Sequence, residues 1–123
     1  MVKMKEICFD LDGVICNQTI GDYENAVPDK KAIEVINKLY NQGNKIIIFT
    51  SRFMGRNQNN VEKTYSQGYE FTLKQLKEWK VKFHKLIMGK PRYDIIIDDK
   101  AVFFKKDWKE ISKQLEKNSK KSE

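Results

Sequence analysis

Lys45-Ile-Ile-Ile-Phe49 is the stretch of sequence that decides the fold. After the lysine, three isoleucines and a phenylalanine follow without a polar position, which is typical of a strand buried on both faces of a parallel sheet. A strand with one face in water would alternate polar and apolar residues instead. The stretch therefore predicts a parallel sheet with helices on both sides, the three-layer Rossmann-like α/β arrangement.

The rest of the chain alternates between strand-like and helix-like patterns. Residues 4–10 become apolar toward Asp10 and predict the first strand, and residues 29–42 carry apolar side chains at helical spacing before Gly43. Strands that alternate with helices support the parallel sheet. The other predicted elements are a helix from Thr72 through Trp79, opened by a capping box of Thr72 and Gln75; strands at 86–88 and 95–97; and a last helix after Asp107, with Trp108, Ile111 and Leu115 on one face.

The length of 123 residues predicts one domain, over 1–117, followed by a polar tail over 118–123. A large cap domain would need many tens of inserted residues. Ile15 to Pro28 is long enough only for a short flap, and Arg52 to Glu70 is predicted to be a long irregular loop. We therefore expect an open site, closed by a bulky substrate or by a neighbouring subunit in a homo-oligomer.

Charge, hydrophobicity and cysteine content indicate which binding partners and which cellular compartment to expect. The net charge is +7, but the lysines are scattered along the chain, which favours a solvated surface over a nucleic-acid interface. No apolar run is long enough to cross a bilayer, and the N-terminus does not resemble a secretory signal. Cys8, in a predicted buried strand, and Cys16, near the candidate site, are too few for a disulfide framework; Cys16 is interpreted as filler rather than a redox-sensitive thiol. These features predict a cytoplasmic protein.

Polar residues follow each of the four predicted strands. Because the carboxyl ends of parallel strands share one edge of a sheet, we expect these polar tracts to converge on one pocket. The four tracts are Asp10-Leu-Asp12-Gly-Val14, Thr50-Ser51-Arg52, Gly89-Lys90-Pro91 and Asp98-Asp99.

Such a pocket suits the transfer of a phosphoryl group. Crowded carboxylates repel one another, and a hard divalent cation such as Mg²⁺ relieves this repulsion by binding to their oxygens. Of Asp10 and Asp12, one can attack phosphorus and the other can move protons. Lys90, the Thr50 hydroxyl and the backbone of the turn at Ser51 supply a cation and donors for phosphate oxygens.

These tracts, in this order, resemble those of the haloacid dehalogenase superfamily of phosphatases. The resemblance implies that Asp10 is the nucleophile and that Asp12 donates and then accepts the proton. It implies that Thr50 holds the phosphoryl group and that Lys90 steadies it. It also implies that Mg²⁺ binds to Asp10, to the Asp12 carbonyl, and to Asp98 and Asp99. The resemblance leaves open whether Asp98 or Asp99 is the more direct ligand.

A narrower resemblance concerns the substrate. Four features look like those of small phosphatases of bacterial capsule and surface-polysaccharide synthesis: Thr50-Ser51-Arg52, the long loop after it, Gly89-Lys90-Pro91, and Tyr93-Asp94 before Ile97-Asp-Asp-Lys-Ala101. This implies a phosphorylated sugar, polyol or nucleotide-sugar-linked substrate, and Arg52 and Arg56 are candidates to bind a second anionic group of it. Because only Gly89 to Tyr93 separates the third and fourth apolar runs, fewer residues than a parallel crossover needs, Lys85 and Lys100 remain alternatives as the active-site lysine.

Two other functions fit the sequence. A phosphatase that acts on nucleic-acid ends, such as a 3′-phosphate, would explain the net charge of +7. A catalytically silent binding protein on the same fold is the second alternative, although the intact pair of Asp10 and Asp12 argues against it. A phosphate-transferring mutase is disfavoured because an open site admits water.

Overall fold

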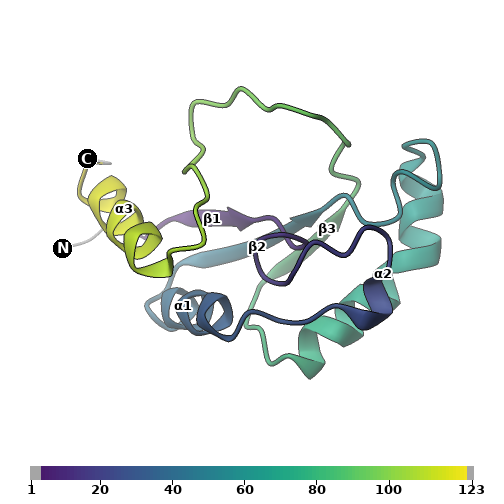
Figure 1. Cartoon of the computed structure of the whole chain (residues 1–123). Coiled ribbons are helices and arrows are strands. Elements are labelled where there is room, and N and C mark those ends of the chain that lie inside the picture. Colours follow the sequence, from purple (N-terminus) through teal and green to yellow (C-terminus); the bar gives the residue numbers. More distant parts are fainter. Residues whose placement is uncertain (1–3, 122–123) are drawn as a thin grey trace.

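Three parallel strands in the order β1-β2-β3 form the central sheet of the computed structural model, which describes the backbone of residues 4–121 and the side chains of residues 4–116 (Figure 1). The strands are β1 (Glu6–Phe9), β2 (Lys45–Thr50) and β3 (Lys85–Met88). In the central strand, Ile48 is paired with Phe9 on one side and with Leu86 on the other. The predicted strands at 4–10, 45–49 and 86–88 are thus confirmed.

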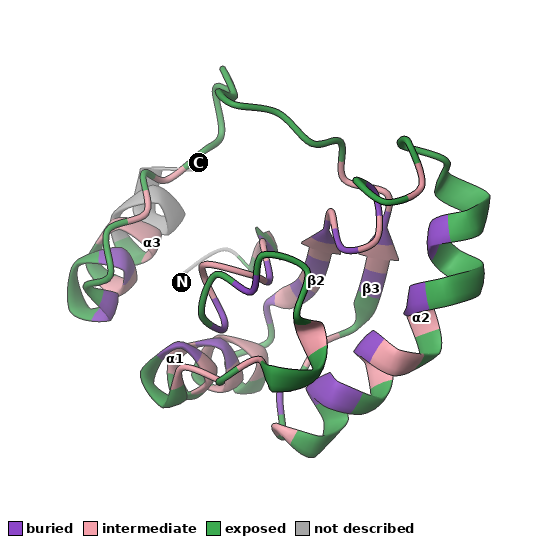
Figure 2. Ribbon diagram, turned by 45° about the vertical axis from the view of Figure 1, so that its right-hand side comes forward, coloured by how far each residue is buried: buried purple, intermediate pink, exposed green. Residues whose placement is uncertain are grey.

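Helices cover both faces of this sheet. The helices α1 (Lys30–Asn41) and α3 (Trp108–Lys121) lie on one side, and α2 (Val61–Glu78) lies on the other (Figure 2). Ile36 of α1, Ile48 of β2 and Leu76 of α2 are completely buried in one continuous core. The predicted three-layer α/β fold is confirmed, with no large cap domain among the described residues.

The first helix begins where the sequence predicted. The Asp29 side chain accepts hydrogen bonds from the N–H groups of Lys31 (3.0 Å) and Ala32 (3.3 Å), which are otherwise unpaired at a helix start. Before it, residues 15–28 form the predicted flap, which includes the short 3-10 helix η1 (Tyr23–Asn25). The Asp107 cap of α3 is also present, as Asp107 Oδ1 accepts the Glu110 N–H at 3.3 Å.

Helix α2 is much longer than predicted. It begins after Asn60, whose side chain accepts the Lys63 N–H at 3.0 Å, so the predicted loop to Glu70 and the predicted capping box of Thr72 and Gln75 are wrong. The buried face of α2 explains the error, because most of its positions are small or polar instead of apolar. Gly68 belongs to this face: a Cβ atom there would lie 2.3 Å from the Phe53 ring. The buried residues are Thr64, Gly68, Thr72, Gln75 and Leu76.

Residues 89–107 form an irregular arch between β3 and α3 (Figure 1). The predicted buried strand at 95–97 is wrong, since Ile95 and Ile97 are 82% and 99% exposed. Fewer residues separate Met88 from Ile95 than the dozen or more that a parallel crossover needs. At the end of the chain, the predicted polar tail over 118–123 is helical as far as Lys121, and residues 122–123 lie outside the described residues.

The strand β1 is less enclosed than predicted. Cys8 was expected in a buried strand, but it is exposed, because β1 lies at the edge of the sheet and only part of it is covered. Its covered side is Phe9, which packs on Trp108 of α3 with ring centroids 6.4 Å apart. No helix in the described part of the chain is both long and apolar enough to cross a membrane.

Candidate functional site

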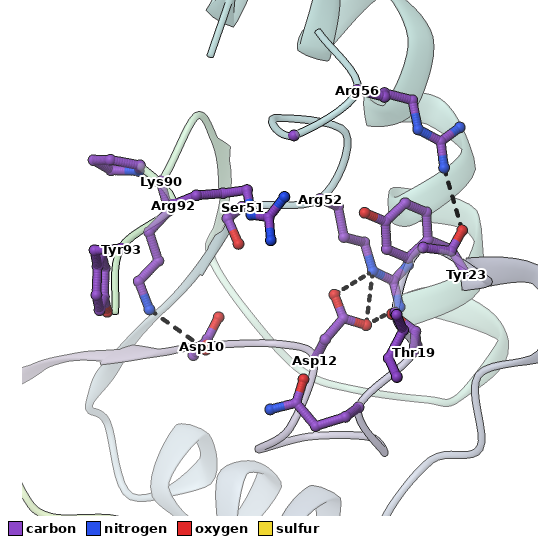
Figure 3. Close-up of a pocket in the computed structure, with 15 residues that line it drawn as sticks. Asp10, Asp12, Thr19, Tyr23, Ser51, Arg52, Arg56, Lys90, Arg92 and Tyr93 are labelled. Carbon is purple, nitrogen blue, oxygen red and sulfur yellow. Dashed lines mark hydrogen bonds and ion pairs between the residues drawn. The ribbon is translucent and has the colours of Figure 1, made fainter. Parts of the chain in front are cut away.

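A cavity of about 540 Å³ opens where β1, β2 and β3 end, and we call it the strand-end cavity (Figure 3). It lies at the edge of the sheet where ligands of parallel α/β proteins bind. Two acidic and four basic side chains line it, so its charged lining is basic overall. The charged residues are Asp10, Asp12, Arg52, Arg56, Lys90 and Arg92, and Ser51, Tyr23 and Tyr93 are among the others.

Asp10 and Lys90 form an ion pair in this cavity. The Lys90 Nζ lies 3.4 Å from Asp10 Oδ2, and the Lys90 N–H donates to the carbonyl of Thr50 at 3.1 Å, which holds the turn after β3 against the end of β2. Gly89 makes this turn with a φ of +91°, a conformation that favours glycine. Lys90 is thus the lysine at the site, while Lys85 and Lys100 do not line the cavity.

The surroundings shift the pKa values of both partners. Burial raises the pKa of Asp10 above its ordinary value, although the charge of Lys90 and the Leu11 N–H, which donates to Asp10 Oδ1 at 2.8 Å, oppose this rise. Burial alone would lower the pKa of Lys90, but a hydrogen bond with Tyr93 and the charge of Asp10 outweigh it and raise the pKa. Lys90 therefore keeps its proton beside a partly buried carboxyl group, and its positive charge offsets the repulsion between that group and an anionic ligand.

Arg52 holds Asp12 in place. Its Nε donates to Asp12 Oδ2 at 2.9 Å, and its Nη2 donates to Asp12 Oδ1 at 2.9 Å. The Arg52 side chain is fully buried, and its Nη1 donates to Gln75 Oε1 at 2.7 Å. Arg52 was predicted to bind substrate, but its guanidinium already has protein partners on each nitrogen, so it acts as a positioning residue for Asp12.

Gln75 and Tyr23 support this arrangement because both contact the Arg52 side chain and they contact each other. The Gln75 Nε2 donates to the Tyr23 carbonyl at 2.7 Å, and the Arg52 guanidinium lies 4.8 Å from the centroid of the Tyr23 ring. Sequence reasoning missed both residues: Gln75 was assigned to a helix cap, and Tyr23 lies in the flap without a motif. A buried glutamine at a core position of a helix was the available signal for Gln75.

Thr50 and Ser51 differ in their positions. Thr50 is 1% exposed and does not line the cavity, and its Oγ1 accepts the Arg52 N–H at 3.1 Å. Alternation along β2 accounts for this, because Thr50 points to the same side as the buried Ile46 and Ile48. The predicted contact of the Thr50 hydroxyl with a phosphoryl group is therefore wrong for this arrangement, whereas Ser51 does line the cavity.

Asp98 and Asp99 lie in the exposed arch and do not line the cavity. Asp98 Oδ1 accepts the Lys100 N–H at 2.8 Å, and Asp99 Oδ2 lies 3.7 Å from Lys100 Nζ. Among the residues that the structure describes, no group of three or more His, Cys, Asp or Glu side chains is close enough to hold a metal ion. The predicted meeting of all four aspartates depended on a strand at 95–97, and it does not occur here.

Two further arginines face the cavity from its rim. Arg56 lies 4.5 Å from the Phe53 ring centroid and donates from Nη2 to the Gly21 carbonyl at 3.2 Å. Arg92 follows Lys90 in the arch, and its guanidinium extends into the cavity in Figure 3. Arg56 was predicted as a substrate-binding residue, and it lines the cavity, so that role stays a prediction. Arg92 was missed because it belongs to no motif.

The two cysteines are expected to differ greatly in reactivity. Cys16 is buried and donates to Asp12 Oδ1 at 3.3 Å; burial, and then the charge of Asp12, raises its pKa to about 12. At a given pH, its thiolate fraction is roughly a thousandfold below that of an ordinary thiol. Alkylation with iodoacetamide, followed by mass spectrometry, is expected to modify the exposed Cys8 first. Equal rates for the folded protein would contradict this prediction, and both thiols should react alike after unfolding in urea.

The comparisons with known proteins bear on the fold. No protein-family model matches the chain, and no curated protein matches it. Among solved structures, the chain is similar to a protein from Vibrio cholerae, described only as a crystallographic target, with a TM-score of 0.77 and 27% sequence identity. The match covers 94% of this chain and 98% of that chain, so the two share one small α/β fold over nearly their whole lengths.

Proposed function

We propose that this chain is a phosphomonoester hydrolase in which Asp10 forms a transient phosphoaspartate. The observation that carries the proposal is the Asp10 carboxyl group, which faces a mainly basic cavity with Lys90 Nζ 3.4 Å away. Transfer of a phosphoryl group needs cations and hydrogen-bond donors around the three non-bridging oxygens. A carboxylate among such groups is placed to attack phosphorus while the negative charge of the substrate is neutralised.

The proposed reaction has two steps. First, an Asp10 carboxylate oxygen attacks phosphorus, the ester P–O bond breaks, and the leaving oxygen takes a proton from Asp12. Second, water attacks the phosphorus of the phosphoaspartate, Asp12 takes a proton from that water, and inorganic phosphate leaves as Asp10 is regenerated. The contacts of Arg52 with Asp12, at 2.9 Å to each carboxylate oxygen, hold this side chain beside Asp10 and favour its carboxylate form, which is the form that takes the proton in the second step.

Magnesium dependence, which the superfamily resemblance implies, is a separate part of the proposal. The donors gathered at the cavity do not fit Mg²⁺ as arranged, because Asp10 is paired with Lys90 and Asp12 with Arg52. The other two proposed ligands, Asp98 and Asp99, lie in the arch. The two steps above therefore use only side chains of the chain, and the metal requirement is tested on its own.

The test is release of phosphate from p-nitrophenyl phosphate, followed by a screen of phosphosugars, phosphorylated polyols, nucleotides and oligonucleotides with a terminal phosphate. Release above background is expected, and parallel reactions with added Mg²⁺ and with EDTA measure the metal requirement. A substrate with a sugar or polyol skeleton, as in surface-polysaccharide synthesis in the cytoplasm, is the expected preference. No release from any of these compounds, with or without Mg²⁺, would exclude the proposed function.

The open cavity bears on the quaternary structure. It lies at the surface beside the exposed residues Ile20 and Tyr93, and the flap from Ile15 to Pro28 covers only part of it. We therefore include a homo-oligomer in the proposal, with a neighbouring subunit closing the site. Sedimentation velocity over a range of concentrations tests this part, and a monomer at all of them would contradict it.

A further inference from the structure

The chain uses arginine only at the strand-end cavity. Of its 24 basic residues, just three are arginines, namely Arg52, Arg56 and Arg92, and all three line this cavity. Among the lysines whose side chains the structure describes, only Lys90 lines it. A lysine would serve equally well for a solvated surface charge. Arginine differs because its planar guanidinium binds carboxylate and phosphate groups through two parallel hydrogen bonds.

The acidic side chains of the cavity neutralise only two of its four basic groups. Lys90 is paired with Asp10, and Arg52 is paired with Asp12. Arg56 and Arg92 form no ion pair with a carboxylate within residues 4–116. Two guanidinium groups at the rim are thus left to bind an anion from solution.

The guanidinium of Arg56 is held before any anion binds, and that of Arg92 lies close to the same loop. Arg56 lies against two aromatic rings, 4.5 Å from the centroid of Phe53 and 5.4 Å from that of Tyr23. Arg92 packs on the residue just before Arg56: a Cβ atom at Gly55 would lie 2.5 Å from Arg92 Nη1. The absence of a side chain at Gly55 therefore lets Arg92 approach the loop that carries Arg56. Such preorganisation reduces the entropic cost of binding.

We infer that Arg92 and Arg56 form a subsite for a second anionic group of the substrate, a carboxylate or a second phosphate. The inference rests on the proposed function, in which the transferred phosphoryl group lies beside Asp10, Lys90 and Ser51. A cavity of about 540 Å³ has the size of sites that enclose a whole small ligand. The substrate class is therefore phosphomonoesters whose organic part is itself anionic.

Two pairs of ligands test the inference. Glycerol 3-phosphate and 3-phosphoglycerate differ by a carboxylate, and glucose 6-phosphate and glucose 1,6-bisphosphate differ by a phosphate. Binding is measured by calorimetry on the Asp10→Asn protein, so that turnover does not interfere. At least one doubly anionic ligand is expected to bind about tenfold more tightly than its partner, as a charge-assisted hydrogen bond predicts, and the favoured pair distinguishes carboxylate from phosphate.

Variants locate the effect. In the Asp10→Asn background, Arg92→Gln is expected to remove most of the preference by lowering the affinity for the doubly anionic ligand more than that for the singly anionic one, and Arg56→Gln is expected to reduce the preference. Arg92→Lys, which keeps the charge but not the fork of donors, is expected to restore only part of it. Lys74→Gln removes one charge from an exposed helix position away from the cavity and serves as the matched control.

The outcomes separate this inference from the proposed function. Equal affinities within both pairs, no binding of any of the four ligands, or a preference that survives both arginine substitutions would overturn the subsite. If the wild-type protein releases no phosphate but the Arg92-dependent preference is present, the proposed hydrolase falls and the subsite stands. If phosphate is released but the preference is absent, the hydrolase stands and the subsite falls.

Discussion

Phosphate release by the Asp10→Asn protein is expected to fall by roughly a thousandfold or more, to the background of the assay, because loss of a nucleophile removes the covalent step. The amide keeps the size of the side chain and its place beside Lys90, so the change is chemical rather than steric. Phosphate release from p-nitrophenyl phosphate measures the effect, and mass spectrometry of the quenched wild-type reaction is expected to show the added phosphoryl group on Asp10. Full activity in this variant would remove Asp10 as the nucleophile.

The same variant has an expected stability that distinguishes lost chemistry from lost folding. Burial raises the pKa of Asp10 in the folded chain. A carboxyl group with a raised pKa favours folding while it is protonated, and this contribution is lost as the pH rises through the folded pKa. In buffer with EDTA, urea unfolding is therefore expected to show Asp10→Asn gaining stability over the wild type between about pH 4 and about pH 7. Asp94→Asn, at an exposed position outside the strand-end cavity, should show no loss of activity.

Replacing Arg52 by methionine is expected to lower the free energy of unfolding by about 3 kcal/mol, the low end of the range for breaking a buried ion pair. The Arg52 side chain is fully buried and that of Asp12 is 17% exposed, so Asp12 would be left with little solvent to compensate its charge. Gln75 Oε1 would lose its donor as well. Unfolding by guanidinium chloride at neutral pH measures the loss of stability. Lys74→Met, at an exposed helix position, is the control and is expected to change the free energy of unfolding by less than about 0.5 kcal/mol.

A double-mutant cycle attributes this loss to the contact itself. Combining Arg52→Met with Asp12→Asn is expected to cost less than the sum of the single changes, with a coupling of about 1–3 kcal/mol. A coupling near zero would show that Arg52 and Asp12 act independently and would contradict the assignment of Arg52 as the residue that positions Asp12. Arg52→Lys keeps the charge without the fork and is expected to fall between the wild type and Arg52→Met.

The elements that the sequence predicts well are those whose buried positions are apolar. The strand β2 has Ile46 and Ile48 fully buried, and α1 follows a capping aspartate with apolar residues at helical spacing. Helix α2 was predicted only in its last part, because its buried face contains Thr64, Gly68 and Thr72. Hydrophobic periodicity does not detect a face that packs through small residues, and here the close approach of Phe53 to Gly68 determines it.

The sequence predicts those site residues that directly follow the paired strands of the sheet. Asp10, Asp12, Ser51 and Lys90 reach one cavity because they follow neighbouring parallel strands. Side-chain alternation along β2 separates the buried Thr50 from Ser51 and is a property of any strand at this place in the sequence. The prediction for Asp98 and Asp99 needed a further strand, and an apolar triplet does not by itself supply the connection that such a strand requires.

The position of β1 at the rim of the sheet has a consequence for handling the protein. An edge strand presents unpaired backbone N–H and C=O groups that a strand of another molecule can match, which is a route to aggregation. Here the strand is only four residues long and begins with the charged Glu6, two features that oppose such pairing. The triplet from Ile95 to Ile97 in the arch is also apolar and exposed, so removing the charge of Glu6 would leave two surface segments that favour precipitation of concentrated solutions.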